Sequence, residues 1–113
     1  MKEEKGYITL LKRRESRKRE LRMSAWTEAE RLSALLKENF EYEALYLIGS
    51  VARGKGFHSH SDIDLIIKGL KKESFFKALA LLIKNSTFPV DLKPWEEFDA
   101  ESKTRVEKEG KIL

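Results

Sequence analysis

The sequence contains no cysteine and no glutamine, and its 113 residues include only two asparagines and two prolines. The absence of cysteine excludes disulfide bonds, thiolate metal sites and cysteine nucleophiles. No apolar run approaches the roughly 18 to 20 residues that span a bilayer, and the N-terminus lacks the apolar segment of a signal peptide. We therefore expect a cytoplasmic protein without a membrane-spanning segment. The 15 lysines and 15 glutamates, with so few amide side chains, are typical of heat-adapted proteins.

A chain of this length suits a single domain with a modest core. Apolar residues recur at steps of three and four from Leu21 to Phe40, which predicts an amphipathic helix. We expect one long helical extension over residues 1–40, with a basic first half that projects from a catalytic core formed by residues 41–113. A capping-box pattern that starts at Thr27 leaves two shorter helices as the alternative.

The rest of the chain alternates between short apolar runs and amphipathic segments. We expect, in order, a strand, a short helix, a strand, a helix, a strand and a helix over residues 45–48, 50–53, 63–67, 71–84, 88–93 and 99–109. Helix 71–84 has a wide apolar face that should pack over the sheet, and this face consists of Phe75, Phe76, Leu79, Leu82 and Ile83. Asp99 and Gly110 suit the two caps of the last helix.

Two aspartates open the second strand. Because strand side chains alternate between faces, Asp62 and Asp64 project from the same side of the sheet, about 7 Å apart along the backbone. Carboxylates beside an apolar strand lose water and repel each other unless a cation lies between them. Oxygen ligands favour Mg²⁺ or Mn²⁺, and Mg²⁺ is often bound by one or two carboxylates together with substrate phosphates. The pattern predicts a metal site that acts on a phosphate ester or a nucleotide, although an aspartate at a strand end is also often a solvated turn residue.

A Gly-Ser turn follows the first strand. Gly49 lets the backbone approach a phosphate, and the amides after Ser50, at the start of a short helix, can bind oxyanions. Arg53 is a candidate phosphate contact and is equally well explained as a surface charge. In the third strand, Asp91 lies on the face opposite Val90 and Leu92, where a single aspartate is unremarkable. The two histidines of the intervening loop, His58 and His60, are better explained as loop residues than as ligands of Mg²⁺.

Together these residues resemble the minimal nucleotidyltransferases of the DNA-polymerase-beta-like superfamily, in particular its antitoxin group. The signature of that family is Gly-Ser, a spacer of about ten residues, Asp-x-Asp, and a third aspartate on a later strand. The matching residues are Gly49, Ser50, Asp62, Asp64 and Asp91, and Ala52-Arg53-Gly54 and Ser61 are also usual in the family. Eleven residues separate Ser50 from Asp62, one more than the commonest spacing, which leaves open the roles of Lys55, Phe57, His58 and His60.

The resemblance implies an α+β nucleotidyltransferase fold with a small mixed three-stranded sheet in the order 1-2-3. It implies that Asp62, Asp64 and Asp91 are catalytic and bind two Mg²⁺ or Mn²⁺ ions, and that Gly49, Ser50 and Arg53 bind the nucleotide. The expected reaction transfers AMP from ATP to a hydroxyl group. The expected acceptor is a HEPN-family toxin, for which this protein is the antitoxin, and self-association through the helices is the simpler alternative.

Two other functions stay open. A non-catalytic antitoxin or binding module would keep the fold without needing the three aspartates. An RNA-binding protein would use the N-terminal charge, since residues 1–25 carry nine basic and four acidic side chains, a net charge of +5, whereas residues 26–113 carry 14 and 15, a net charge of −1. Basic residues near the Gly-Ser turn would favour a nucleic-acid substrate. Here the basic residues are confined to the N-terminal helix, where they are also explained as a solvated helix face.

Overall fold

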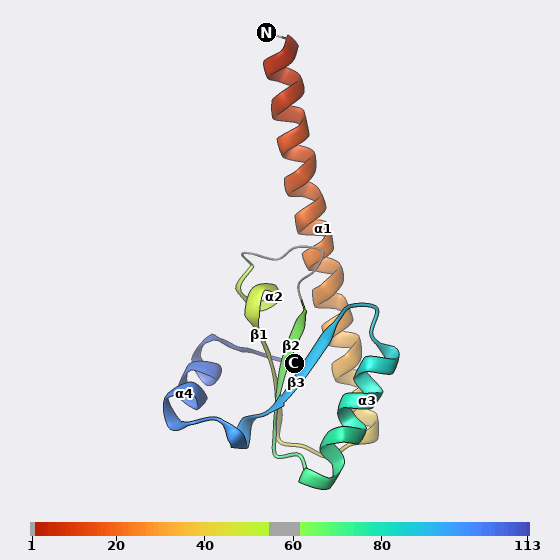
Figure 1. Cartoon of the computed structure of the whole chain (residues 1–113), viewed down its shortest axis with the longest axis vertical. Helices are drawn as coiled ribbons and strands as arrows, with labels where there is room; N and C mark the ends of the chain where they lie inside the picture. Colours follow the sequence, from red (N-terminus) through yellow and green to blue (C-terminus); the bar gives the residue numbers. More distant parts are fainter. Residues whose placement is uncertain (1, 55–61) are drawn as a thin grey trace.

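The computed structural model describes residues 2–54 and 62–113 (Figure 1). The elements follow the predicted order with one further strand at the end: α1 (Lys2–Asn39), β1 (Ala44–Ile48), α2 (Gly49–Arg53), β2 (Ile63–Lys68), α3 (Phe75–Asn85), β3 (Val90–Pro94), α4 (Ala100–Glu109) and β4 (Lys111–Ile112). Short 3-10 helices precede α3 at Lys72–Ser74 and α4 at Trp95–Glu97. No helix in this described part of the chain is long and apolar enough to cross a bilayer.

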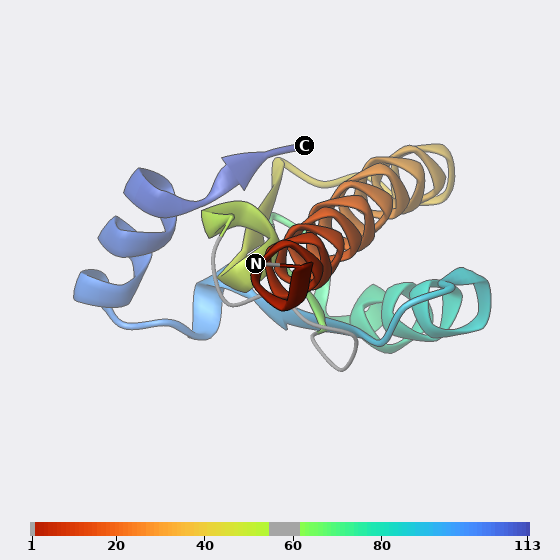
Figure 2. The ribbon, with the colours of Figure 1, turned by 90° about the horizontal axis from the view of Figure 1, so that it is seen from above.

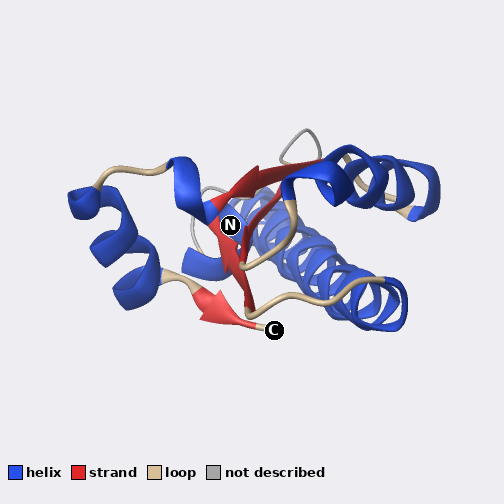
Figure 3. Cartoon of the chain, turned by 90° about the horizontal axis from the view of Figure 1, so that it is seen from below, coloured by secondary structure: helices blue, strands red, loops and turns tan. Residues whose placement is uncertain are grey.

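The sheet has four strands in the order β3-β2-β1-β4, which corrects the expected three (Figure 3). The expected order of the first three strands is confirmed, and β4 pairs with the other side of β1. A strand of two residues, Lys111–Ile112, is too short to show the alternation from which strands are predicted. The sheet is mixed, because β1 pairs antiparallel with β2 and β4 while β2 pairs parallel with β3. The architecture is α+β.

Helices cover both faces of the sheet. In Figure 2, α1 and α3 lie on one side of the strands and α4 lies on the other. The first face forms the larger core, which includes the buried strand residues Leu45, Leu47, Ile63, Leu65, Ile67 and Leu92. The second face carries a smaller cluster in which Tyr46 and Ile66 pack with Val106 of α4. Because side chains alternate along a strand, Asp64 and Asp91 lie on the face of α4.

The N-terminal extension is one continuous helix of 38 residues, as expected, rather than two. Its second half packs on the sheet through Ala25, Ala29, Leu32 and Leu36, all fully buried. Its first half projects away from the sheet and the other helices (Figure 1). The apolar stripe predicted from the sequence therefore anchors only the C-terminal half of α1.

Helix α3 packs through a narrower face than expected. Ala78 and Leu82 are buried, and Phe75 and Leu79 pack against the core in part. Phe76 and Ile83, by contrast, are 78% and 60% exposed, so the expectation that they pack over the sheet is wrong. The helix lies at the edge formed by β3 and α1, where only one stripe of its surface reaches other elements.

Candidate active site

Gly49 joins β1 to α2 and lies directly against Asp64. Its φ of +79° is in the left-handed region, which residues with a side chain rarely adopt. A Cβ atom built on Gly49 would lie 2.5 Å from Oδ2 of Asp64, closer than nonbonded atoms can approach. This contact follows from the antiparallel register, in which Ile48 pairs with Asp64. The structure thus brings the Gly-Ser turn and the Asp-x-Asp motif together.

The parallel pairing of β2 and β3 brings the third aspartate to the same place. Asp64 and Asp91 are register partners, so their side chains leave neighbouring strands on the same face. Asp62 lies just before β2 and is exposed, whereas Asp64 and Asp91 are half-buried. The three predicted aspartates therefore share one edge of the sheet, next to the start of α2.

Electrostatics at this edge disfavour the ionised form of Asp64. Burial raises the pKa of Asp64 above its ordinary value, and the nearby charges of Asp62 and Asp91 raise this pKa further. The positive charges of Lys93 and Arg53 act in the opposite direction but do not cancel the rise. A divalent cation between the carboxylates would offset this repulsion, so the donor set suits a hard metal ion.

Lys93 was not among the residues expected at the site. Its Nζ atom lies 3.4 Å from Oδ2 of Asp91, and both side chains are partly exposed. In the described part of the chain, no three His, Asp or Glu side chains lie close enough together to hold one ion. The carboxylates thus share a face and interact electrostatically, while Asp91 is paired with a lysine two residues along its own strand.

A cavity of about 210 Å³ lies beside Gly49, between α2 and α4. It is lined by Ile48, Gly49, Ala52, Arg53, Arg105, Val106 and Glu109. The predicted Arg53 thus faces the same space as Arg105, whose guanidinium also lies 3.7 Å from Glu101. The sequence does predict that Arg105 and Glu109 share a face of α4, because they lie one turn apart on a predicted helix. It does not predict that α4 packs beside the Gly-Ser turn.

A second unexpected residue links α1 to the site. Arg22 donates a hydrogen bond from Nε to the backbone carbonyl of Val51 in α2, at 3.1 Å. Gly54, which ends α2 with a φ of +76°, leaves room for the guanidinium, since a Cβ there would lie 3.0 Å from it. The element that carries Ser50 is therefore fixed to the long helix.

Several residues expected near the site lie outside the described residues. These are Lys55, Phe57, His58, His60 and Ser61.

A Gly-Ser turn set against carboxylates from neighbouring strands, on one face of a small mixed sheet, defines a domain built for nucleotide chemistry. The family model described as "Polymerase beta, Nucleotidyltransferase" matches residues 30–113. The chain belongs to this nucleotidyltransferase family, as the sequence resemblance predicted. The match begins within α1 and covers every other element, so the projecting half of α1 precedes it.

Two solved structures share the fold. One, described as the toxin-antitoxin MntA-HpeT in a mutant form, has a TM-score of 0.60 and 25% sequence identity, covering 75% of this chain and 70% of that chain. Another, described as a toxin-antitoxin with AMP-PNP, has a TM-score of 0.59 and 23% identity, covering 76% of this chain and 69% of that chain. No curated protein matches the sequence. The expected resemblance to the antitoxin group of the minimal nucleotidyltransferases is confirmed.

Proposed function

We propose that this protein transfers AMP from ATP to a hydroxyl group on a toxin of the HEPN family, and so acts as its antitoxin. Membership of the nucleotidyltransferase family supports the transfer reaction. The likeness to a chain of a toxin-antitoxin complex supports the partner. The AMP-PNP in the second relative makes an adenine nucleotide the first donor to test. A cytoplasmic location, where ATP and such a partner would meet, stays a prediction.

The register of three strands carries this proposal. Ile48 pairs with Asp64, and Asp64 pairs with Asp91, so one strand position aligns the Gly-Ser turn with two carboxylates. Because a Cβ added to Gly49 would lie 2.5 Å from Asp64 Oδ2, any other residue at position 49 would have to displace this carboxylate. A phosphate at the turn would thus lie beside the carboxylates. That proximity is what transfer from a metal-bound nucleoside triphosphate requires.

In this proposal each predicted residue takes part in metal binding, nucleotide binding or proton transfer. Asp62, Asp64 and Asp91 would hold the divalent ions, and Asp91 would also orient the acceptor hydroxyl. Gly49 and Ser50 bind the β- and γ-phosphates through the backbone, and Arg53 contacts the phosphates from the cavity side. Two ions, when bound, would supply charge stabilisation for both the attacking and the leaving oxygen.

The reaction is an in-line displacement at the α-phosphorus. The acceptor oxygen forms a bond to the α-phosphorus while the bond from that phosphorus to the bridging oxygen of the β-phosphate breaks. The bond electrons leave with pyrophosphate. The Asp91 carboxylate accepts the hydroxyl proton, directly or through a water molecule. The proton then passes from Asp91 to solvent, and Lys93, whose Nζ atom lies 3.4 Å from Oδ2 of Asp91, stabilises the regenerated carboxylate between turnovers.

An open site explains why a partner is needed. Asp62, Arg53 and Arg105 are exposed, so water would reach a bound nucleotide and compete as an acceptor. Few surrounding contacts also mean weak nucleotide binding, because little interaction offsets the entropy of immobilising the ligand. A partner that covers this edge of the sheet would supply the acceptor and exclude water. Self-association remains the alternative way to close the site.

Labelling with ATP tests the proposal. The purified protein is mixed with Mg²⁺, ATP labelled at the α-phosphate and the candidate HEPN-family toxin, for which the product of the neighbouring gene is the first choice. We expect a labelled partner, little label without the partner, and none with Asp62→Asn, Asp64→Asn or Asp91→Asn. Asp99→Asn is the matched control, because Asp99 caps α4 away from the site and asparagine caps equally well.

Rapid labelling of RNA or of a small molecule without the partner would overturn the choice of acceptor. Neutralisation of the toxin by all three variants would favour the non-catalytic antitoxin.

A further inference from the structure

The projecting half of α1 is strongly basic and lies outside the family match. Residues 8–22, called the basic arm here, carry seven Lys or Arg and two Glu side chains, a net charge of +5. The seven basic residues are Lys12, Arg13, Arg14, Arg17, Lys18, Arg19 and Arg22. The family match starts at residue 30, so neither the transfer site nor the shared core accounts for this charge.

Most of the arm is exposed, and its positive charges have no ion-pair partner among the residues that the structure describes. Residues 12–15 and 17–20 are all exposed. Of the ion pairs among the described residues, none involves a basic residue of the arm. A run of basic side chains along a helix repels itself, so an external polyanion would stabilise it.

The distribution of charge selects among polyanionic partners. At 100° per residue, the seven basic side chains are spread around the whole circumference of the helix rather than along one stripe. A membrane-surface helix needs an apolar face opposite its charges, and a coiled coil needs an apolar seam. Residues 12–20 contain no apolar side chain and so provide neither. Among residues 8–22, the exposed apolar side chains that the structure describes are Ile8, Leu10 and Leu11, all before the run of charges.

A nucleic-acid groove matches a helix that is basic on all sides. A helix with its side chains is about 10–12 Å in diameter, close to the roughly 12 Å width of the B-DNA major groove, where phosphates flank it on both sides. The 15 residues of the arm span about 22 Å at a rise of about 1.5 Å per residue. We propose that the basic arm binds the phosphate backbone of a nucleic-acid duplex.

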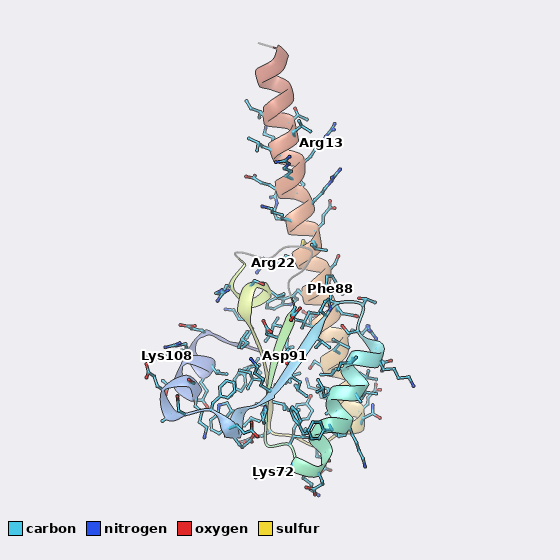
Figure 4. The ribbon with its side chains drawn as sticks, viewed as in Figure 1. Arg13, Arg22, Lys72, Phe88, Asp91 and Lys108 are labelled. Carbon is cyan, nitrogen blue, oxygen red and sulfur yellow. The ribbon has the colours of Figure 1, made fainter. Side chains whose placement is uncertain are left out.

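The arm leaves the body at the edge that carries the candidate active site. In Figure 1 it emerges beside α2 and the start of β2. Figure 4 shows Arg13 out on the projecting part and Arg22 at its base, nearer to Asp91 along the long axis. The Arg22 hydrogen bond to Val51 fixes the base of the arm to α2. A duplex bound along the arm would therefore end beside the Gly-Ser turn.

Two variants of the full-length protein with equal charge test this binding. The arm variant carries Arg13→Gln, Arg14→Gln, Arg17→Gln and Arg19→Gln. The control carries Lys71→Gln, Lys72→Gln, Lys77→Gln and Lys84→Gln, which are exposed positions on the body. Each set removes four positive charges. Arginine and glutamine have similar helix propensities, so circular dichroism should show an intact α1 in the arm variant.

Binding is measured by fluorescence anisotropy with a labelled 20-bp DNA duplex and an RNA hairpin, between 50 and 200 mM salt. We expect wild-type affinity to fall steeply with salt and the arm variant to bind at least tenfold more weakly at 50 mM. Its slope of log K against log salt should be shallower by about 3–4, from roughly 0.9 per neutralised phosphate contact. A variant with lysine at the same four positions should bind like the wild type. Because the major groove of B-DNA admits a helix and that of A-form RNA is deep and narrow, we expect tighter binding to the DNA duplex than to the RNA hairpin.

The proposal is overturned if the control loses as much affinity as the arm variant or if the wild type does not bind at 50 mM salt. Tighter binding to vesicles containing phosphatidylserine than to either duplex would also overturn it. The assay contains EDTA and no ATP, so it is independent of nucleotidyl transfer. A failure of either proposal therefore leaves the other standing.

Discussion

At the scale of single residues, Gly49 is constrained twice. The left-handed φ of +79° strains any residue with a Cβ, and Oδ2 of Asp64 occupies the place of that Cβ. The absence of a side chain at Gly49 thus permits both the backbone conformation at the start of α2 and the position of the predicted metal ligand Asp64. A change at Gly49 should affect both stability and nucleotide binding.

We predict that Gly49→Ala lowers the free energy of unfolding by about 1–3 kcal/mol, the range for strained backbone positions. Urea denaturation measures this loss. Gly54→Ala is the control, because its φ is also positive but its added Cβ would meet only the movable guanidinium of Arg22. The loss at Gly49 should be larger, and adding Asp64→Ala should recover part of it. Equal losses at both glycines, with no recovery, would contradict a collision with Asp64.

Replacing Asp64 should stabilise the folded protein at pH 7, in contrast to the change at Gly49. Its pKa is raised in the folded protein, by burial first and then by Asp62 and Asp91. Its contribution to stability is therefore present below the ordinary carboxyl pKa and is lost as pH rises through the folded pKa. We expect Asp64→Asn to raise the melting temperature at pH 7, to match the wild type near pH 3, and to abolish Mg²⁺-dependent binding of ATP. Thermal shift assays measure both effects.

The control for this prediction is Asp99→Asn. Asp99 accepts a hydrogen bond from the Ser102 amide, which lowers the pKa of Asp99, so its neutralisation should not stabilise the protein at pH 7. A lower melting temperature of Asp64→Asn at pH 7, or unchanged metal-dependent ATP binding, would refute the metal-site assignment.

At the scale of elements, a buried carboxylate ties α1 to the loop before β3. Glu28, only 7% exposed, accepts hydrogen bonds from Arg31 and from both the amide and the hydroxyl of Thr87, at 2.6 and 2.8 Å. Arg31 in turn donates to the carbonyl of Asn85. The hydrogen bond from Arg31 is the main reason that the pKa of Glu28 falls to about 2, against the opposing effect of burial. This cluster positions the start of β3, the strand that carries Asp91.

We predict that the stability due to Glu28 is present above the unfolded pKa of about 4.5 and is lost as pH falls towards about 2. Glu28→Gln should lower the free energy of unfolding by about 2–3 kcal/mol at pH 7, the scale of hydrogen bonds to a charged group. Its deficit should shrink as pH falls below 4. Glu30→Gln, an exposed change on the same helix, should have little effect. Denaturation curves from pH 2 to 7 measure both, and a deficit independent of pH would contradict the prediction.

The sequence predicted the type and order of the helices and strands up to α4, but it predicted neither β4 nor the way in which the elements pack together. Alternation along the strands placed Asp64 and Asp91 on a face, because successive side chains of a strand point to opposite sides of the sheet. The pairing of Asp64 with Asp91 depends on the register of β2 and β3, and the apolar periodicity of the sequence does not specify this register. The position of Arg105 depends on where α4 crosses the second face of the sheet. Spacing along the chain finds local partners, whereas the cavity joins residues more than 50 positions apart.

At the scale of the whole molecule, α1 gives a small domain an elongated shape. The radius of gyration is 17.0 Å and the longest dimension is 62 Å. A compact domain with this number of residues would have a radius of gyration of about 13 Å. The excess comes from the projecting half of α1, which extends beyond the core (Figure 1). One helix therefore serves the core at one end and presents the basic arm at the other.

This division predicts a gradient of stability along a single helix. Residues 29–37 belong to the half that packs on the sheet, so their amides should exchange hydrogen only when the domain unfolds. Residues 12–20 have no core to pack on, and helical segments of this length are marginal alone in water, so their amides should exchange at least roughly tenfold faster. Hydrogen exchange on dilute protein measures both rates, and a DNA duplex should slow exchange in the arm. Strong protection of the arm that disappears on dilution would instead mean that a second copy of the chain covers it, because only self-association depends on protein concentration in this way.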